Sequence, residues 1–134
     1  AVSYPAFKGK FGSKVEGVFG AGGVDQSSPK IQEYFKAHKE ITGKAADSWA
    51  SANTYASLEI LGQAIEGAGT LDRKTVTQYI KDNTFDTIMG PISFDNQISK
   101  KYWTVGQYQD GEFRGVKSSQ MDGAAPIVAK DGWN

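Results

Sequence analysis

The pattern of apolar and polar positions is most unusual between Trp49 and Ala68, where Glu59 and Glu66 are the only charged residues. Apolar or small side chains surround nearly the whole helix that this stretch predicts, whereas a surface helix has one apolar stripe and one charged face. The helix is expected to be about 30 Å long and to need protein on most of its sides. A chain of 134 residues offers few elements to cover it.

The remaining pattern predicts an α/β layer architecture, because a strand, three helices and further strands follow one another. Ser28-Pro29 is typical of a helix start, and Gly43 of a helix end. Asp110-Gly111 between two extended runs predicts a hairpin. The expected helices are Tyr4–Phe11, Pro29–Thr42, Trp49–Ala68 (capped by Asp47 or Ser48) and Asp72–Asn83. The expected strands are Val15–Gly20, Thr87–Met89, Ile92–Phe94, Tyr102–Gln109 and Glu112–Val116, and the tail Lys117–Asn134 is expected to wrap over a surface.

Composition places the chain among ordinary globular domains, with 39% hydrophobic and 22% charged residues. Lys plus Arg equals Asp plus Glu, 15 each, so no basic surface for nucleic acid or for an anionic membrane is expected. The absence of cysteine excludes disulfides and thiolate chemistry. The start AVSYPAF has neither the charged nor the apolar region of a signal peptide. We expect a processed chain or a piece of a longer one.

Residues for catalysis are scarce. The single histidine, His38, lies on the apolar stripe of its predicted helix, where a packed or capping role is favoured over catalysis. No Ser lies in a G-x-S-x-G elbow, and no His/Cys cluster has metal spacing. The spacing of Asp82, Asp86 and Asp95 matches no calcium loop. We therefore expect no catalytic residue, no metal site and no cofactor.

Two features are candidates for ligand binding. Gly20-x-Gly22 follows a predicted strand, but Asp25 replaces the third glycine of a dinucleotide fingerprint. The glycines instead indicate a crossover whose dihedrals change, a close approach to a ligand, or a tight loop without function. Polar residues such as Asn53 at the start of the long helix either face a cleft, where the helix N-terminus attracts a carboxylate, or simply satisfy the first turn, which is slightly favoured.

Several motifs, in this order, resemble the C-terminal part of the type I periplasmic solute-binding proteins of ABC transporters, the branched-chain amino acid-binding family. The resemblance covers about residues 1 to 116. The motifs are the helix from Tyr55-Ala56 to Ala64-Ile65-Glu66-x-Ala68-Gly69, Leu71-Asp72-Arg73, Thr84-Phe85-Asp86-Thr87 with Gly90-Pro91-Ile92-x-Phe94-Asp95, and Val105-Gly106-Gln107-Tyr108-Gln109-Asp110-Gly111.

The resemblance implies two Rossmann-like α/β lobes with mostly parallel sheets, joined by three crossing segments, with a ligand cleft between the lobes. This chain would hold only part of that fold. Residues 1–19 would form the end of the second lobe and a crossing strand. Residues 20–101 would form the late part of the first lobe, and residues 102–134 the third crossing, a hairpin and a tail on the second lobe. The expected hinge residues are Gly20, Tyr102 and Trp103, and the expected ligand-binding residues are Trp49, Asn53, Gly22 and Gly23.

The function implied is capture of a small amino acid or carboxylate for an ABC permease in the periplasm or elsewhere in the cell envelope, without catalysis. The missing N-terminal part, or a second copy of the chain, would complete the fold. Two alternatives remain open: a ligand-sensing ectodomain of the same fold, and an α/β enzyme domain that uses Asp25 or Asp86 as an acid or base. The enzyme lacks a recognisable nucleophile or metal partner.

Overall fold

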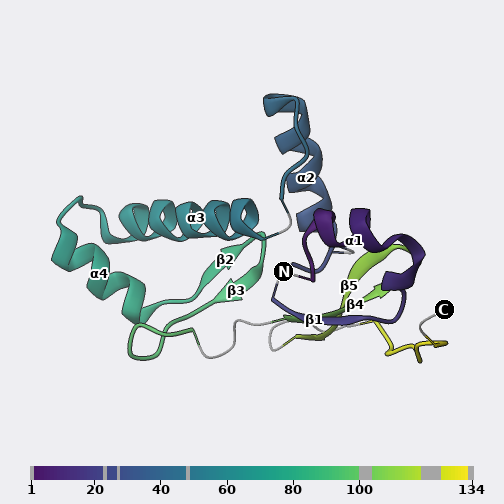
Figure 1. The fold of residues 1–134 in the computed structure, drawn as a ribbon. Coiled ribbons are helices and arrows are strands. Elements are labelled where there is room, and N and C mark those ends of the chain that lie inside the picture. The colour runs from purple at the N-terminus through teal and green to yellow at the C-terminus, as the bar shows by residue number, and fades with distance from the viewer. Residues whose placement is uncertain are drawn as a thin grey trace.

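The computed structural model describes residues 2–22, 24–26, 28–47, 49–99, 104–118 and 125–132. Two groups of elements stand side by side, and a single helix, α2, rises between them (Figure 1). In chain order the elements are α1 (Pro5–Phe11), the 3₁₀ helix η1 (Gly12–Val15), β1 (Phe19–Ala21), α2 (Pro29–Thr42), α3 (Ala50–Ala68), α4 (Arg73–Asp82), β2 (Phe85–Thr87), β3 (Gly90–Ile92), β4 (Thr104–Gln109) and β5 (Glu112–Ser118).

The first group consists of α3, α4 and the hairpin β2–β3. Its core contains Ile60 and Ala64 of α3, Val76 of α4, and Phe85 and Ile92 of the hairpin. Asp72, the expected start of this helix, is the N-cap of α4, and its carboxylate accepts hydrogen bonds from the Thr75 hydroxyl and amide. These bonds, the hydroxyl bond first, lower the pKa of Asp72. A second small core of Val24, Ile31 and Ala52 joins α2 to the start of α3.

The second group consists of α1, η1 and an antiparallel sheet with the strand order β1-β4-β5. Tyr108 and Phe113 face each other across β4 and β5 and pack with Val15, while Phe7 of α1 packs against this cluster. Asp110 and Gly111 both have positive φ, 54° and 77°, which is the geometry of a type I′ hairpin turn. The hairpin predicted from this dipeptide is thus confirmed.

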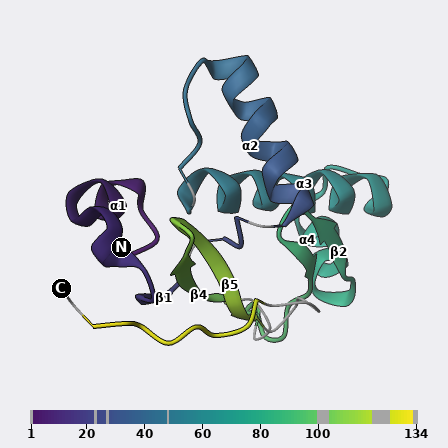
Figure 2. The same ribbon diagram turned by 90° about the vertical axis from the view of Figure 1, so that its right-hand side faces the viewer.

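The described part of the tail, residues 125–132, lies against the second group as the sequence indicated, whereas Lys117 and Ser118 belong to β5 and not to the tail. Residues 125–132 run beneath the sheet toward α1 (Figure 2). The Ala125 amide donates to the Gly115 carbonyl, and the Lys130 ammonium donates to the carbonyls of Lys14 and Glu16. Residues 125–132 are therefore attached through main-chain and polar contacts.

Three expectations about strands need correction. Val15 belongs to η1 and not to a strand. Both strands of the β2–β3 hairpin start and end two residues earlier than expected. The turn is at Ile88-Met89, and Gly90-Pro91 lies inside β3. Pro91 fits an edge strand because it has no amide to donate. The mostly parallel sheet is not confirmed, since every strand pair in the described part of the chain is antiparallel.

The described residues cover one side of the long helix α3. Ala52, Ala56, Ile60 and Ala64 are buried, while Tyr55, Leu58 and Leu61 are exposed. This agrees with the expectation that 134 residues do not cover the whole helix. None of the helices in the described ranges is long and apolar enough to cross a membrane.

Candidate functional site

Three segments that are far apart in the sequence meet at the start of α3. The ring of Trp49, at the N-cap position of α3, stacks on Tyr4, which precedes α1, with 6.3 Å between ring centroids and 8° between planes. Tyr4 remains 38% exposed and Trp49 37% exposed. The edge of the indole lies against Gly22, where a Cβ atom would collide with the ring. Tyr4, Gly22 and Trp49 are called the aromatic cluster below.

Gly22 is required here for two reasons. Its φ of +84° is a conformation that side-chain-bearing residues rarely adopt, and the indole leaves no space for a Cβ. Its amide donates to the Thr104 carbonyl at 2.8 Å, which fixes it beside the strand β4. The two expected ligand-binding residues Trp49 and Gly22 are therefore in contact, while Gly23 lies outside the described residues.

The two strands that pass this cluster, β1 and β4, run side by side. Gly20, an expected hinge residue, pairs with Gly106, so two residues without side chains face each other. A Cβ at either position would press on the Phe113 ring. The other expected hinge residues, Tyr102 and Trp103, lie outside the described part of the chain.

Asn53 is turned back along its own helix. Its side-chain amide donates to the Trp49 carbonyl at 2.8 Å, and Ser51 Oγ donates to the Asp47 carbonyl at 2.7 Å. The sequence had suggested that these side chains satisfy the amides of the first turn. In these bonds neither side chain does so. Asp47 satisfies the first amides instead, because its carboxylate accepts hydrogen bonds from the amides of Trp49 and Ala50. An internal carboxylate thus already occupies the helix N-terminus where a solute carboxylate was considered.

The titratable candidates lie elsewhere and are dispersed. His38 is half-buried, with its Nδ1 at 3.4 Å from the Tyr34 hydroxyl. Asp86 is exposed and ion-paired with Lys30 at 2.7 Å, whereas Asp25 is buried against Gly115. Burial raises the pKa of Tyr108, which belongs to the sheet. Among the described residues, no three His, Asp or Glu side chains gather as metal ligands would.

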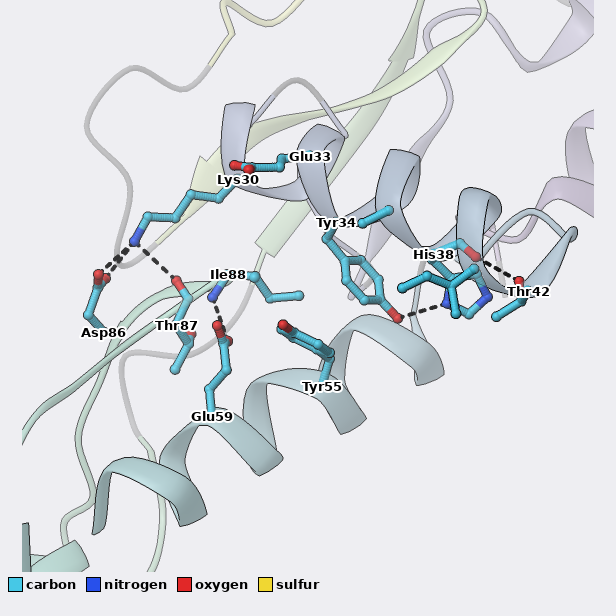
Figure 3. A pocket seen from close by; sticks show the side chains of 12 residues that line it. Lys30, Glu33, Tyr34, His38, Thr42, Tyr55, Glu59, Asp86, Thr87 and Ile88 are labelled. Atoms are coloured by element: carbon cyan, nitrogen blue, oxygen red, sulfur yellow. Dashed lines mark hydrogen bonds and ion pairs between the residues drawn. The ribbon is translucent and has the colours of Figure 1, made fainter. Parts of the chain in front are cut away.

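A pocket of about 520 Å³ lies between α2, α3 and the end of β2. The rings of Tyr34 and Tyr55 face each other in it with centroids 4.9 Å apart, and the Lys30–Asp86 ion pair closes one end (Figure 3). Glu59 reaches from α3 to accept the Ile88 amide at 2.8 Å. Sequence reasoning missed this pocket, although Tyr34 and His38, four residues apart on one helix, indicate a shared face.

Sequence reasoning also missed Tyr4 and Gly106. Tyr4 was assigned only to the start of a short helix, and its contact with Trp49 spans 45 positions of the chain, so no local pattern could reveal it. Gly106 carried a signal, because it interrupts an otherwise regular strand.

A model of the family described as periplasmic binding protein matches residues 6–112. This chain belongs to the periplasmic binding protein family. The match contains Gly20, Gly22, Trp49 and Asn53, whereas Tyr4 lies just before it. A search of curated protein sequences gave no match.

Solved structures of periplasmic binding proteins share the fold. A leucine-, isoleucine-, valine-, threonine- and alanine-binding protein from Brucella ovis matches with a TM-score of 0.71 and 17% identity, over 96% of this chain and 38% of its own. A leucine-binding protein from Thermotoga maritima matches with a TM-score of 0.61 and 24% identity, over 83% and 33%. An ABC transporter solute-binding protein from R. palustris in complex with benzoate matches with a TM-score of 0.66 and 11% identity, over 97% and 37%. The chain spans about a third of the length of these proteins.

Proposed function

We propose that this chain is the C-terminal part of a solute-binding protein that captures a small amino acid or carboxylate for an ABC transporter. The observation that carries the proposal is the aromatic cluster, because it joins Tyr4, Gly22 and Trp49 from three separate segments beside two strands that run together. Family membership supports the binding role. The solute class comes from the relatives named above, which bind leucine or benzoate.

The proposal divides the chain as the sequence suggested. Residues 1–19 and 102–134 belong to the second lobe and its crossings, and residues 20–101 to the first lobe. The solute is held between the lobes by Trp49 as an aromatic wall, by Asn53, and by the main chain at Gly22 and Gly23. Half-exposed aromatic faces with a few polar groups are typical of such sites. The mostly parallel sheets belong to the parts of both lobes that lie outside this chain.

Capture follows from contacts with both lobes. A solute that contacts both lobes is bound more tightly in the closed state, so its binding shifts the population toward closure. We assign the bending to Gly20 and Gly106 and to the segment with Tyr102 and Trp103. Closed protein then delivers solute to the permease from the periplasm or the cell envelope. The proposal includes no catalytic step.

Thermal unfolding of the full-length protein with a panel of solutes tests this function. Leucine, phenylalanine, benzoate and 4-hydroxybenzoate serve as probes, with glucose as a control. Binding to the native state alone adds about 2.7 kcal/mol at 100 times Kd, so at least one amino acid or carboxylate should raise Tm. Trp49→Ala should lose that rise, whereas Lys74→Ala on the charged face of α4 should keep it. No rise with any amino acid or carboxylate would refute the proposed function.

A further inference from the structure

The two rings of the aromatic cluster come from the two different groups of elements. Trp49 immediately precedes α3 in the first group, and Tyr4 immediately precedes α1 in the second group. Their planes are almost parallel, with 8° between them and 6.3 Å between ring centroids. Two flat and partly exposed ring faces therefore meet where the two groups adjoin.

Trp49 is the fixed ring of this pair. The edge of its indole lies against Gly22, whose amide donates to the Thr104 carbonyl at 2.8 Å. The main chain of Trp49 is held as well, because its amide donates to the Asp47 carboxylate at 2.9 Å. A ring that is held at its edge and through its main chain presents its face in a defined position.

Tyr4 is anchored through its main chain and not through its hydroxyl. The Tyr4 carbonyl accepts from the Phe7 amide at 2.9 Å, and the Val2 carbonyl accepts from the Tyr108 hydroxyl at 3.0 Å. Within the described residues, neither the Tyr4 hydroxyl nor the Trp49 indole N–H has a hydrogen-bond partner. The Tyr4 ring can therefore turn without losing a bond there, and both groups can donate to an oxygen of a solute.

The spacing of the pair suits a flat ring. Aromatic rings that stack directly have centroids about 4.5–7 Å apart, so 6.3 Å lies toward the wide end of that range. A third ring between two others requires about 7 Å, because stacked carbon atoms approach to about 3.5 Å. A turn of the Tyr4 side chain supplies the remainder. A saturated ring is thicker than an aromatic one and has no π face to stack.

The acidic residues near the cluster do not favour a solute with an ammonium group. Asp47 is the acidic residue beside Trp49, and its carboxylate already accepts main-chain amides at the start of α3. Asp25, three residues after Gly22, is buried against Gly115. The two donors of the rings instead suit a carboxylate or a hydroxyl substituent.

We propose that Tyr4 is a specificity-determining residue of the solute site, and that Tyr4 and Trp49 clamp the flat ring of an aromatic carboxylate between them. The proposal rests on the proposed function, and it narrows the solute from a small amino acid or carboxylate to an aromatic carboxylate. Because the two rings belong to different groups of elements, a solute ring that stacks on both contacts both groups. Such a contact favours the closed state.

Calorimetric titration of the full-length protein with matched solutes tests the proposal. Benzoate and 4-hydroxybenzoate are compared with cyclohexanecarboxylate, which has the same charge and a six-membered ring without a π face. Leucine and phenylalanine represent the amino acids. We expect the Kd of the tighter benzoate to be at least about 10-fold lower than that of cyclohexanecarboxylate, because only the aromatic ring stacks on both faces.

Two substitutions at position 4 separate the ring from the hydroxyl. Tyr4→Leu should lose the preference for the aromatic solute, whereas Tyr4→Phe should keep it. Phe11→Leu is the matched control, because Phe11 is also an exposed ring on α1 but packs on Phe7. This control should leave the preference unchanged. The Tm of each variant without solute shows that it is folded, which is expected because Tyr4 is 38% exposed.

A preference for the benzoates that Tyr4→Leu alone abolishes supports the proposal. Equal affinities for the benzoates and cyclohexanecarboxylate in the wild type would overturn it and leave the proposed function standing. Tighter binding of leucine or phenylalanine than of both benzoates would do the same, and so would an unchanged preference in Tyr4→Leu. Binding of no amino acid or carboxylate at all would refute the proposed function and this inference with it.

Discussion

At the residue scale, the aromatic cluster depends on a glycine more than on either ring. Gly22 lies in a positive-φ conformation and receives the edge of the Trp49 indole. Its main chain is tied to β4 through the bond to the Thr104 carbonyl. Gly22 therefore links the position of Trp49 to the position of β4.

Gly22→Ala should destabilise the full-length protein more than Gly43→Ala does. Both glycines have positive φ, 84° and 71°, so both substitutions cost about 1–2 kcal/mol of backbone strain. Only position 22 adds a collision with Trp49, since nothing lies near a Cβ at position 43. The collision should add about 1–3 kcal/mol, measured by urea denaturation. Equal losses would show that the indole does not rest on Gly22.

Tyr108 should make stability depend on alkaline pH. The Tyr108 hydroxyl donates to the Val2 carbonyl at 3.0 Å, and burial raises the pKa of Tyr108. The unfolded chain therefore loses this proton first, and the contribution of Tyr108 to stability falls as pH rises above about 10. Tyr108→Phe should be less stable by about 1 kcal/mol at pH 7, through the lost hydrogen bond.

The gap in urea midpoint between wild type and Tyr108→Phe should then narrow between pH 7 and pH 10.5. The other tyrosines contribute equally to both proteins and cancel in the comparison. A gap that stays constant over this range would contradict the burial of the Tyr108 hydroxyl.

At the element scale, the fully buried side-chain amide of Gln107 joins the tail to the sheet, beside the contacts of Gln109 with Pro126 and of Lys130 with Lys14 and Glu16. Gln107 Nε2 donates to the carbonyls of Gly17 and Val128 at 3.0 and 2.6 Å. Its Oε1 accepts from the Val128 amide at 3.0 Å and from Gln109 Nε2 at 2.8 Å. Every donor and acceptor of this amide is satisfied at 0% exposure, so the sheet, the Gly17 loop and the tail meet at one residue.

Gln107→Leu should therefore cost about 2–4 kcal/mol, because it removes the four hydrogen bonds of this buried side chain, three of them to the main chain of Gly17 and Val128. Gln78→Leu is the matched control, since the exposed Gln78 side chain bonds only Asp82 on its own helix and the change should stay within about 0.5 kcal/mol. Hydrogen exchange should show faster exchange of the Val128 amide in Gln107→Leu alone. Unchanged protection of Val128 would contradict this role of Gln107.

The sequence predicted the elements that have local signals. Ser28-Pro29 and Gly43 bound α2, Asp72 caps α4, and Asp110-Gly111 forms the hairpin turn. It failed where distant contacts decide the structure. The bounds of β2 and β3 follow from packing on α3, and a glutamine such as Gln107 is buried only because the tail covers it.

The candidate site was predictable in part for the same reason. Trp49 and Gly22 stood out as an aromatic residue at a helix start and as a glycine after a strand, and the structure brings them together. Tyr4 gave no signal because its partner is 45 positions away. Asp47, one of the two expected caps of the long helix, satisfies its first amides, whereas the expectation that residues such as Asn53 do so was wrong in the bond that Asn53 makes to the Trp49 carbonyl.

At the scale of the whole molecule, the two groups of elements meet at the aromatic cluster, where Gly22 lies against Trp49 at the start of α3 and donates its amide to the Thr104 carbonyl of β4. The loop after β1 leads to α2, and the chain returns to the second group at β4 (Figure 1). The strands β1 and β4 pair at Gly20 and Gly106, which have no side chains to resist bending. A bound solute should therefore draw the two groups together.

Small-angle scattering of the full-length protein should show this closure. The radius of gyration should fall when a solute that raises Tm is added at saturation, because the closed state is favoured by contacts with both lobes. Trp49→Ala should not show the fall at the same solute concentration. A wild-type protein that binds solute without any compaction would contradict capture by closure.

The most direct measurement is the crystal structure of the full-length protein with that solute bound. The account predicts the solute between two lobes, in contact with the Trp49 ring and with the main chain at Gly22. A solute bound instead in the pocket between α2 and α3, or away from Trp49 and Gly22 altogether, would contradict it.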